Sequence, residues 1–268
     1  MTGQLRTDKV ARRVNSEIVV VLGWGRAILL QLAHPLVAAG VAEHSGFRRG
    51  SLEYVRRTHR TISAMLRLTY GSPEEIRHQA DSINAIHRRV HGHLRQPTRR
   101  YSAGTYYSAT DPELLRWVHA TLVESQILTF ETFVGDLEPG DKDRYCEEAA
   151  SVGPLLGIPA GYLPENESDL RLYLREMLES DQIEITQAAR DVARALLYPP
   201  GVAVRSMLAF GRLVTTGLLP AELRRAYGFV WEQPQQRRLG TVVRAVRGLR
   251  RVLPARLREW PISRNATP

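Results

Sequence analysis

The sequence predicts an all-α fold in a single domain that covers residues 1–268. Three observations support this prediction. Helix-start signals recur along the chain, strand signals are sparse, and neither an internal repeat nor a low-complexity linker divides it. A composition with 43% hydrophobic residues supplies enough apolar side chains for one large core. We expect about ten helices joined by short connections.

Prolines and capping residues mark where these helices begin. Ser72-Pro73-Glu74-Glu75 combines a capping box with proline at the first helical position, and Thr110-Asp111-Pro112-Glu113 repeats the arrangement. The run from Glu165 to Asp169 opens another helix, and Thr186 opens one that Pro199-Pro200-Gly201 ends. The expected helices are 8–40 (broken), 52–69, 73–94, 111–134, 140–152, 167–178, 186–197, 203–216, 220–227 and 238–252.

Charge and cysteine content narrow the function classes. The net charge of +9 is compatible with a nucleic acid, an acidic membrane surface or an anionic ligand. No helix-turn-helix, RNA-binding sheet motif or zinc finger is recognisable, so nucleic-acid binding is not expected. Cys146 is the sole cysteine, which excludes a disulfide framework and predicts a filler role in a reducing cytoplasm. Polar residues at positions 2–13 argue against a signal peptide and also predict a cytoplasmic protein.

The most apolar stretch, Ile18 to Val41, allows two other interpretations. Arg26, His34 and Pro35 interrupt it, so a buried helix broken near His34-Pro35 is favoured over a membrane span. Its Gly23-Trp24-Gly25 segment resembles the start of a dinucleotide-binding turn. Ile28 occupies the position of the required third glycine, however, and no parallel strand follows. The simpler explanation is that the two small glycines permit close helix packing.

A histidine stands in the apolar seam of the helix expected over 73–94. The seam comprises Ile76, Ala80, Ile83, His87, Val90 and Leu94. His91 would follow His87 by one helical turn, and two histidines so spaced can share a metal. Arg88 and Arg89 between them disfavour a bare dication, whereas haem propionates attract arginine. Residue chemistry alone leaves His87 either a hydrogen-bonded core histidine or a haem or metal ligand.

Four further sites carry candidate functional side chains. Arg57, Arg60 and Thr61 share one helix face, which could anchor carboxylates or be a solvated basic surface. His34 precedes the helix break, with Glu43 further along, and His119 lies on a second strongly apolar helix. Taken on its own, each of these sites is more often structural than functional.

Four segments of the chain resemble the family that contains MpaB-type oxygenases and latex-clearing rubber oxygenases. They are Leu30–Ser45, Arg60-Thr61, Ile83–Gly92 and Tyr107–Val123, and the resemblance extends over roughly residues 10–260. It implies a globin-like helical core that binds haem b, with the iron held by His87. The family's pocket arginine, lysine and threonine match Arg57, Arg60 and Thr61. Arginine in the lysine position stays protonated and is a poor iron ligand.

The expected function is therefore a haem b-dependent oxidoreductase, an oxygenase or peroxidase-like enzyme, acting on an apolar small molecule. His87 would bind the iron, with Arg57, Thr61 and His91 as further cofactor contacts. His34, Glu43, His119, Arg57, Arg60 and Thr61 are the candidate catalytic residues. Because the chain is shorter than the rubber enzymes and shows no secretion signal, an extracellular polymer is not the expected substrate.

Two alternatives remain open at this stage. The first is a non-enzymatic haem- or lipid-binding helical protein. The second is an interaction module built on the basic segment Arg237–Arg258, whose apolar residues are Val242, Val243, Val246, Leu249 and Val252. Such a helix could lie peripherally on the inner face of an anionic membrane, or it could pack on the core with a solvated basic side.

Overall fold

We analysed a computed structural model of the chain, which describes residues 9–44, 51–199 and 208–265. The all-α prediction is confirmed, because helices dominate and the described residues contain one small antiparallel sheet. The elements are α1 Val10–Ser16, η1 Ile18–Val21, α2 Leu22–Gln31, α3 Pro35–His44, α4 Ser51–Tyr70, α5 Pro73–His87, β1 His91–His93, β2 Tyr106–Ser108, α6 Pro112–Phe133, α7 Pro139–Ala150, η3 Pro154–Leu156, α8 Glu167–Glu179, α9 Gln187–Leu197, α11 Ala209–Leu218, α12 Ala221–Tyr227, α13 Gln233–Val252, α14 Ala255–Arg258 and α15 Pro261–Asn265.

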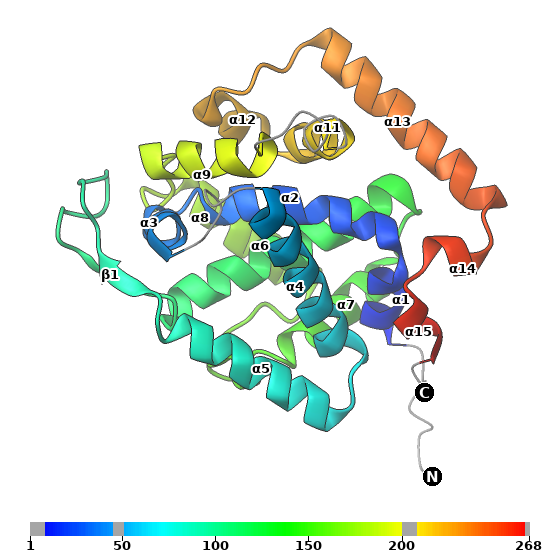
Figure 1. The fold of residues 1–268 in the computed structure, drawn as a ribbon, viewed down its shortest axis with the longest axis horizontal. Helices are drawn as coiled ribbons and strands as arrows, with labels where there is room; N and C mark the ends of the chain where they lie inside the picture. The colour runs from blue at the N-terminus through cyan, green and yellow to red at the C-terminus, as the bar shows by residue number, and fades with distance from the viewer. Residues whose placement is uncertain (1–8, 45–50, 200–207, 266–268) are drawn as a thin grey trace.

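Helices α2 and α6 cross at the centre of the molecule, and the other helices surround them (Figure 1). Trp117 of α6 is fully buried, and the main apolar cluster collects residues from α1, α2, α6, α8 and α9 around it. Its indole N–H donates to the carbonyl oxygen of Gln31 over 3.3 Å, which joins α6 to the end of α2. Burial of this large apolar side chain contributes strongly to the stability of the core.

The predicted helix starts are confirmed at their capping residues. Ser72 Oγ accepts a hydrogen bond from the Glu75 amide at 3.2 Å, and the Ser72 amide donates one to Glu75 Oε2 at 2.8 Å. Asp111 caps α6, and Thr186 caps α9. The break near His34 is also confirmed, since α2 and α3 are bent by 110° there. These signals act locally, which explains why they can be interpreted without the tertiary structure.

The expected helix 73–94 is wrong beyond His87. The amide of Val90 bonds to the His87 carbonyl oxygen, and the chain then enters β1, which pairs with β2 from Tyr106 to Ser108. This long-range pairing overrides the helical spacing of Val90 and Leu94. Elsewhere the differences are smaller. Helix α13 begins at Gln233 rather than 238, and α14 and α15 were not expected. Residues 203–207 of the helix expected at 203–216 lie outside the described residues.

The two glycines of the segment Gly23-Trp24-Gly25 serve helix packing, as the simpler explanation predicts. Both lie in α2, which follows a turn of 3-10 helix, so the dinucleotide-binding interpretation is excluded. A Cβ at Gly23 would overlap the Thr129 side chain and lie 2.8 Å from the Ser125 carbonyl oxygen of α6. A Cβ at Gly25 would overlap Thr215 of α11. Glycine therefore sets how closely α2 approaches its two neighbours.

The substitution Gly23→Ala is expected to lower the free energy of unfolding by about 2 kcal/mol, because the added methyl group forces α2 away from α6. Urea denaturation measures this change. Gly248→Ala is the matched control, since nothing lies within 4 Å of a Cβ at that exposed site in α13. It is expected to stabilise the protein by about 0.5–1 kcal/mol. Equal effects at the two glycines would contradict the packing role.

An ion-pair cluster fastens the C-terminal helices to the start of the chain. Glu17 is buried, and its carboxylate binds Arg250 at 2.5 Å and also pairs with Arg258. The amide of Trp260 donates to the Ser16 carbonyl oxygen at 3.0 Å. These contacts hold α13 and α14 against η1, where Figure 1 shows them at the outer edge of the molecule.

No described helix is by itself long and apolar enough to span a bilayer. The bent pair Ile18–Gln31 and Pro35–His44 reaches that length and apolar content only when its two parts are taken together.

Candidate functional site

The main candidate site is a cavity of about 280 Å³ where α3, the end of α5, β2 and the start of α6 meet. Most of its lining is aliphatic and includes Leu36, Val41, Val90, Leu114 and Val118. The volume lies near the lower end of the range of about 300–1,000 Å³ for small-molecule sites. Such walls favour an apolar ligand, so the few polar side chains among them define the chemistry. Within the described lining these are Gln31, His44, His87, Tyr107 and Ser108.

His87 is the last residue of α5 and faces this cavity. Its ring is partly buried, and Nδ1 is inaccessible and has no hydrogen-bond partner among the described residues. Burial lowers the pKa of the imidazole below its ordinary value. The ring is therefore neutral at pH 7, the form in which histidine binds a metal.

Glu43 lies beside the cavity and is bound by two partners. The hydroxyl of Tyr107 donates to Glu43 Oε2 at 2.5 Å, and Arg95 Nε donates to Oε1 at 2.8 Å. The Tyr107 hydrogen bond, followed by that of Arg95, lowers the pKa of the Glu43 carboxyl group. Tyr107 is 2% exposed and lines the cavity, whereas Glu43 lines an open groove of about 670 Å³ between α3 and α9. The pair thus connects the cavity wall to a solvent-facing surface.

His91 does not stand beside His87 as the helical spacing predicted. It lies on β1, is exposed, and its ring centroid is 6.3 Å from that of Tyr106. The expectation that His87 and His91 share a helix face is wrong, because α5 ends at His87. His44 instead supplies a second imidazole to the lining, and its Nε2 is 3.1 Å from the His91 carbonyl oxygen.

His34 occupies a separate buried position. It is 2% exposed, and its Nε2 lies 3.2 Å from the hydroxyl of Tyr101, which donates to Gln182 over 3.2 Å. Burial lowers the pKa of His34 to about 4, so the ring is neutral. The structure does not place His34 in the described lining of the His87 cavity. Its contacts join the helix break to the segment that precedes α9.

His119 also lies outside the described lining, although Leu115 and Val118 of the same helix are part of it. Its Nε2 is 2.9 Å from the Ala149 carbonyl oxygen, which ties α6 to the end of α7. Burial lowers the pKa of this imidazole more strongly than the bond to Ala149 raises it. A hydrogen bond of this kind is typical of a structural histidine.

The predicted basic face lies on α4, which packs against α5. Arg60 and Thr61 are exposed and do not appear in the described lining of the cavity. The side chain of Arg57 lies outside the described residues. The structure therefore leaves the predicted roles of all three as predictions. Among the described residues, no cluster of three or more histidine, cysteine or acidic side chains could hold a bare metal ion.

Comparison with known proteins identifies the family. The model of the family described as "ER-bound oxygenase mpaB/B'/Rubber oxygenase, catalytic domain" matches residues 11–251. The chain belongs to this family. The MpaB/rubber oxygenase match covers nearly the whole chain, which confirms the predicted resemblance and the oxygenase class of the catalytic domain.

Two relatives of this MpaB/rubber oxygenase family member come from mycobacteria. Uncharacterized proteins of Mycobacterium bovis and Mycobacterium tuberculosis are each 28% identical over 233 residues, which is 85% of this chain and 88% of theirs. No solved structure matches the chain, so the expected globin-like arrangement of this family member stays a prediction.

Tyr107, Arg95 and His44 are the site residues that sequence reasoning did not select in this MpaB/rubber oxygenase domain. Tyr107 comes from β2, and Arg95 follows β1, so both reach Glu43 through the sheet. No local sequence pattern predicts such a contact. His44 adjoins Glu43 in the sequence, and its position at the end of α3 was the one available signal.

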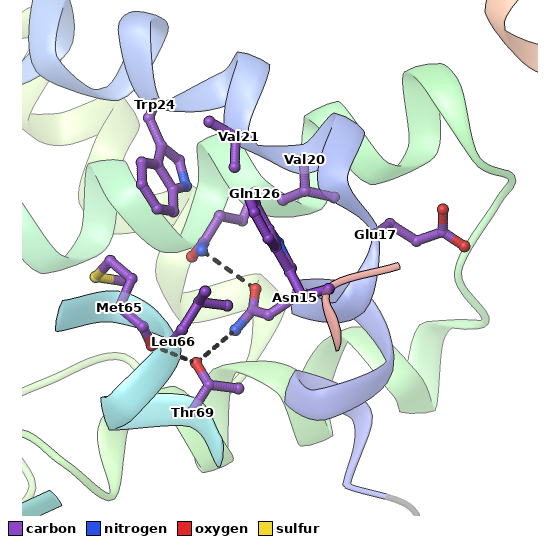
Figure 2. A pocket seen from close by; sticks show the side chains of 10 residues that line it. Asn15, Glu17, Val20, Val21, Trp24, Met65, Leu66, Thr69 and Gln126 are labelled. Atoms are coloured by element: carbon purple, nitrogen blue, oxygen red, sulfur yellow. Dashed lines mark hydrogen bonds between the residues drawn. The ribbon is translucent and has the colours of Figure 1, made fainter. Parts of the chain in front are cut away.

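A second, small pocket with both polar and apolar lining lies away from His87, between α1, α4 and α6 (Figure 2). Asn15 bridges Gln126 and Thr69 there, with distances of 3.2 Å and 3.4 Å. Trp24 Nε1 lines the same pocket and has no hydrogen-bond partner among the described residues. The volume of about 10 Å³ suits one water molecule. This pocket is therefore part of the packing of the oxygenase domain rather than a substrate site.

Proposed function

We propose that this chain is a haem b-dependent oxygenase in which His87 binds the iron and the substrate is an apolar small molecule. The observation that carries this proposal is a partly buried, neutral imidazole in an apolar cavity, with one ring nitrogen that lacks a partner among the described residues. Membership in a family of oxygenase catalytic domains favours an enzyme over a non-catalytic haem- or lipid-binding protein.

The residue types around His87 suit a haem group, and the cavity of about 280 Å³ must widen to admit a whole porphyrin. The aliphatic lining can contact a porphyrin ring and exclude water from it. The propionates require cations, and exposed Arg88 and Arg89 directly follow His87. Arg57, Arg60 and Thr61 of α4 remain the further candidates that the family resemblance suggests. A bound haem would supply the activation of dioxygen or peroxide.

The protein's own contribution would be orientation, exclusion of water and control of protons. Glu43, kept ionised by Tyr107 and Arg95, would fix the orientation of the Tyr107 hydroxyl in the cavity wall, while its own carboxylate faces the groove. Tyr107 holds its hydroxyl proton toward Glu43 because burial, followed by the hydrogen bond to Glu43, raises its pKa. His34 and His119 are not part of the described cavity lining, and we assign them no contact with the substrate.

Titration of the purified protein with haemin tests the cofactor. We expect an intense visible absorption band that saturates at one haem per chain. Protons compete with iron for the imidazole, and burial lowers the pKa of His87. Haem affinity is therefore expected to stay constant between pH 8 and about 6.5, the ordinary histidine pKa, and to fall only at lower pH. A colourless protein, or an affinity that already falls between pH 8 and 7, would contradict the proposal.

A further inference from the structure

The outer surface of the C-terminal helices carries large aliphatic side chains that the core leaves uncovered. Helix α13 packs on the core through Leu239, Val242, Val243 and Val246, which meet the cluster around Phe133 and Val214. The remaining aliphatic residues of this segment point elsewhere. Leu249 is 56% exposed, Val252 is 77% exposed, and Leu257 of α14 is 60% exposed. The apolar face predicted from the sequence is thus divided between the core and the surface.

The same segment is strongly and uniformly basic. From Gln233 to Arg258 it contains eight arginines and no acidic residue. Three of these arginines serve the fold: Arg250 and Arg258 bind Glu17, and Arg247 donates to the carbonyl oxygens of residues 131 and 132. The other five are exposed, and none pairs with a carboxylate over residues 9–44, 51–199 and 208–265. They are Arg237, Arg238, Arg244, Arg251 and Arg256.

Exposed arginine and aliphatic residues adjoin one another near the C-terminal end of α13. Arg237, Arg244 and Arg251 repeat at seven-residue intervals, which aligns them in one row along α13. Val252 follows Arg251 directly, and Leu249 lies one helical turn before Val252. Long arginine side chains beside exposed aliphatic residues can reach polar phosphates while the aliphatic groups enter an apolar layer.

We propose that this basic aliphatic surface, formed by Leu249, Val252, Leu257, Arg237, Arg244 and Arg251, docks peripherally on an anionic lipid membrane. Cations attract the anionic headgroups, and the three exposed aliphatic side chains enter the boundary between headgroups and acyl chains. Nucleic acids and acidic proteins satisfy the arginines equally well. Nucleic acids offer no apolar layer for isolated leucine and valine side chains, because they are bound through phosphate contacts and aromatic stacking. An acidic protein would need a separate apolar pocket for each of these side chains, whereas a bilayer offers one continuous apolar layer.

Co-sedimentation of the full chain with large vesicles tests the proposal. We expect binding to phosphatidylcholine vesicles that contain 30% phosphatidylglycerol, and little binding to phosphatidylcholine alone. Removing charge in the variant Arg237→Gln/Arg244→Gln/Arg251→Gln is expected to lower the partition coefficient about fivefold per arginine, or about 100-fold in total. Removing apolar area in Leu249→Ser/Val252→Ser should lower it about tenfold while every charge is kept.

The matched control is Leu172→Ser/Arg175→Gln on α8, where the leucine is 44% exposed and the arginine is exposed. This variant is expected to bind vesicles like the original protein. Each altered side chain lies on the surface, so every variant is expected to fold. Thermal denaturation of all variants verifies this. Wild-type vesicle binding by Leu249→Ser/Val252→Ser would overturn the proposal, because binding would then depend on electrostatic attraction alone. Absence of vesicle binding, with duplex DNA bound instead, would overturn it as well.

Discussion

Replacing His87 by alanine is expected to abolish the haem absorption band. His87 is the imidazole in the cavity wall with a buried nitrogen that has no partner among the described residues, and its lowered pKa keeps it neutral. Loss of an outer contact to a metal-binding histidine already costs about 10–100-fold in affinity. Loss of the ligand itself should therefore weaken haem binding by more than about 100-fold.

Two controls make the His87→Ala experiment specific. His91→Ala alters an exposed histidine of β1, so it should leave haem affinity unchanged. Added imidazole should restore part of the absorption band in His87→Ala, because the truncated side chain leaves room for a free ligand in the cavity. Absorption titration measures both effects. If His87→Ala binds haem with unchanged affinity, the assignment of His87 as the iron ligand is wrong.

Replacing Arg26 by methionine is expected to cause the largest loss of stability among the single substitutions considered. Arg26 is 4% exposed in α2, and its guanidinium group joins three helices. Nε donates to the Leu218 carbonyl oxygen at 2.7 Å, Nη1 to Ser125 Oγ at 2.7 Å, and Nη2 to Glu124 Oε1 at 2.9 Å. Removing the cation leaves the Glu124 carboxylate without its counter-charge.

Breaking a buried ion pair costs about 3–5 kcal/mol. The Glu124 side chain is 27% exposed and can be partly rehydrated, so we expect a loss of about 3 kcal/mol. This corresponds to a Tm lower by about 6–12 °C. The second substitution in Arg26→Met/Glu124→Gln should recover part of the loss, because it removes the unpaired charge. Urea and thermal denaturation measure both variants. A loss below about 1 kcal/mol would show that the ion pair has no structural role.

The boundaries of the helices show which parts of the fold local sequence signals can predict. Ser72 and Thr186 were identified as capping residues, and the signal at Thr110–Glu113 predicted the start of α6 to within one residue of its cap Asp111, because a cap acts within its own turn of helix. The end of α5 was placed too late because Val90 and Leu94 continue the helical spacing of the apolar seam. That spacing competes with the pairing of β1 and β2, and the pairing depends on residues 106–108, which are distant in the chain.

The candidate site likewise combines residues that the sequence predicted with residues that only the structure revealed. Apolar periodicity and family resemblance identified His87, and the structure places it in the lining of an apolar cavity. Glu43 was also selected, but its two partners Tyr107 and Arg95 come from the small sheet and were not foreseen. His34 and His119 were grouped with them as buried histidines, yet each is directed to a separate hydrogen-bond partner.

The sequence by itself therefore determined the all-α class, most helix starts and the family, and it predicted His87 as the iron ligand. These depend on spacing within one helix and on residue chemistry. Only the tertiary structure decided which side chains share the cavity, why Arg26 and Gly23 lie at helix contacts, and which aliphatic residues of α13 stay exposed. Those depend on contacts between segments far apart in the chain, where burial and partner geometry outweigh local preference.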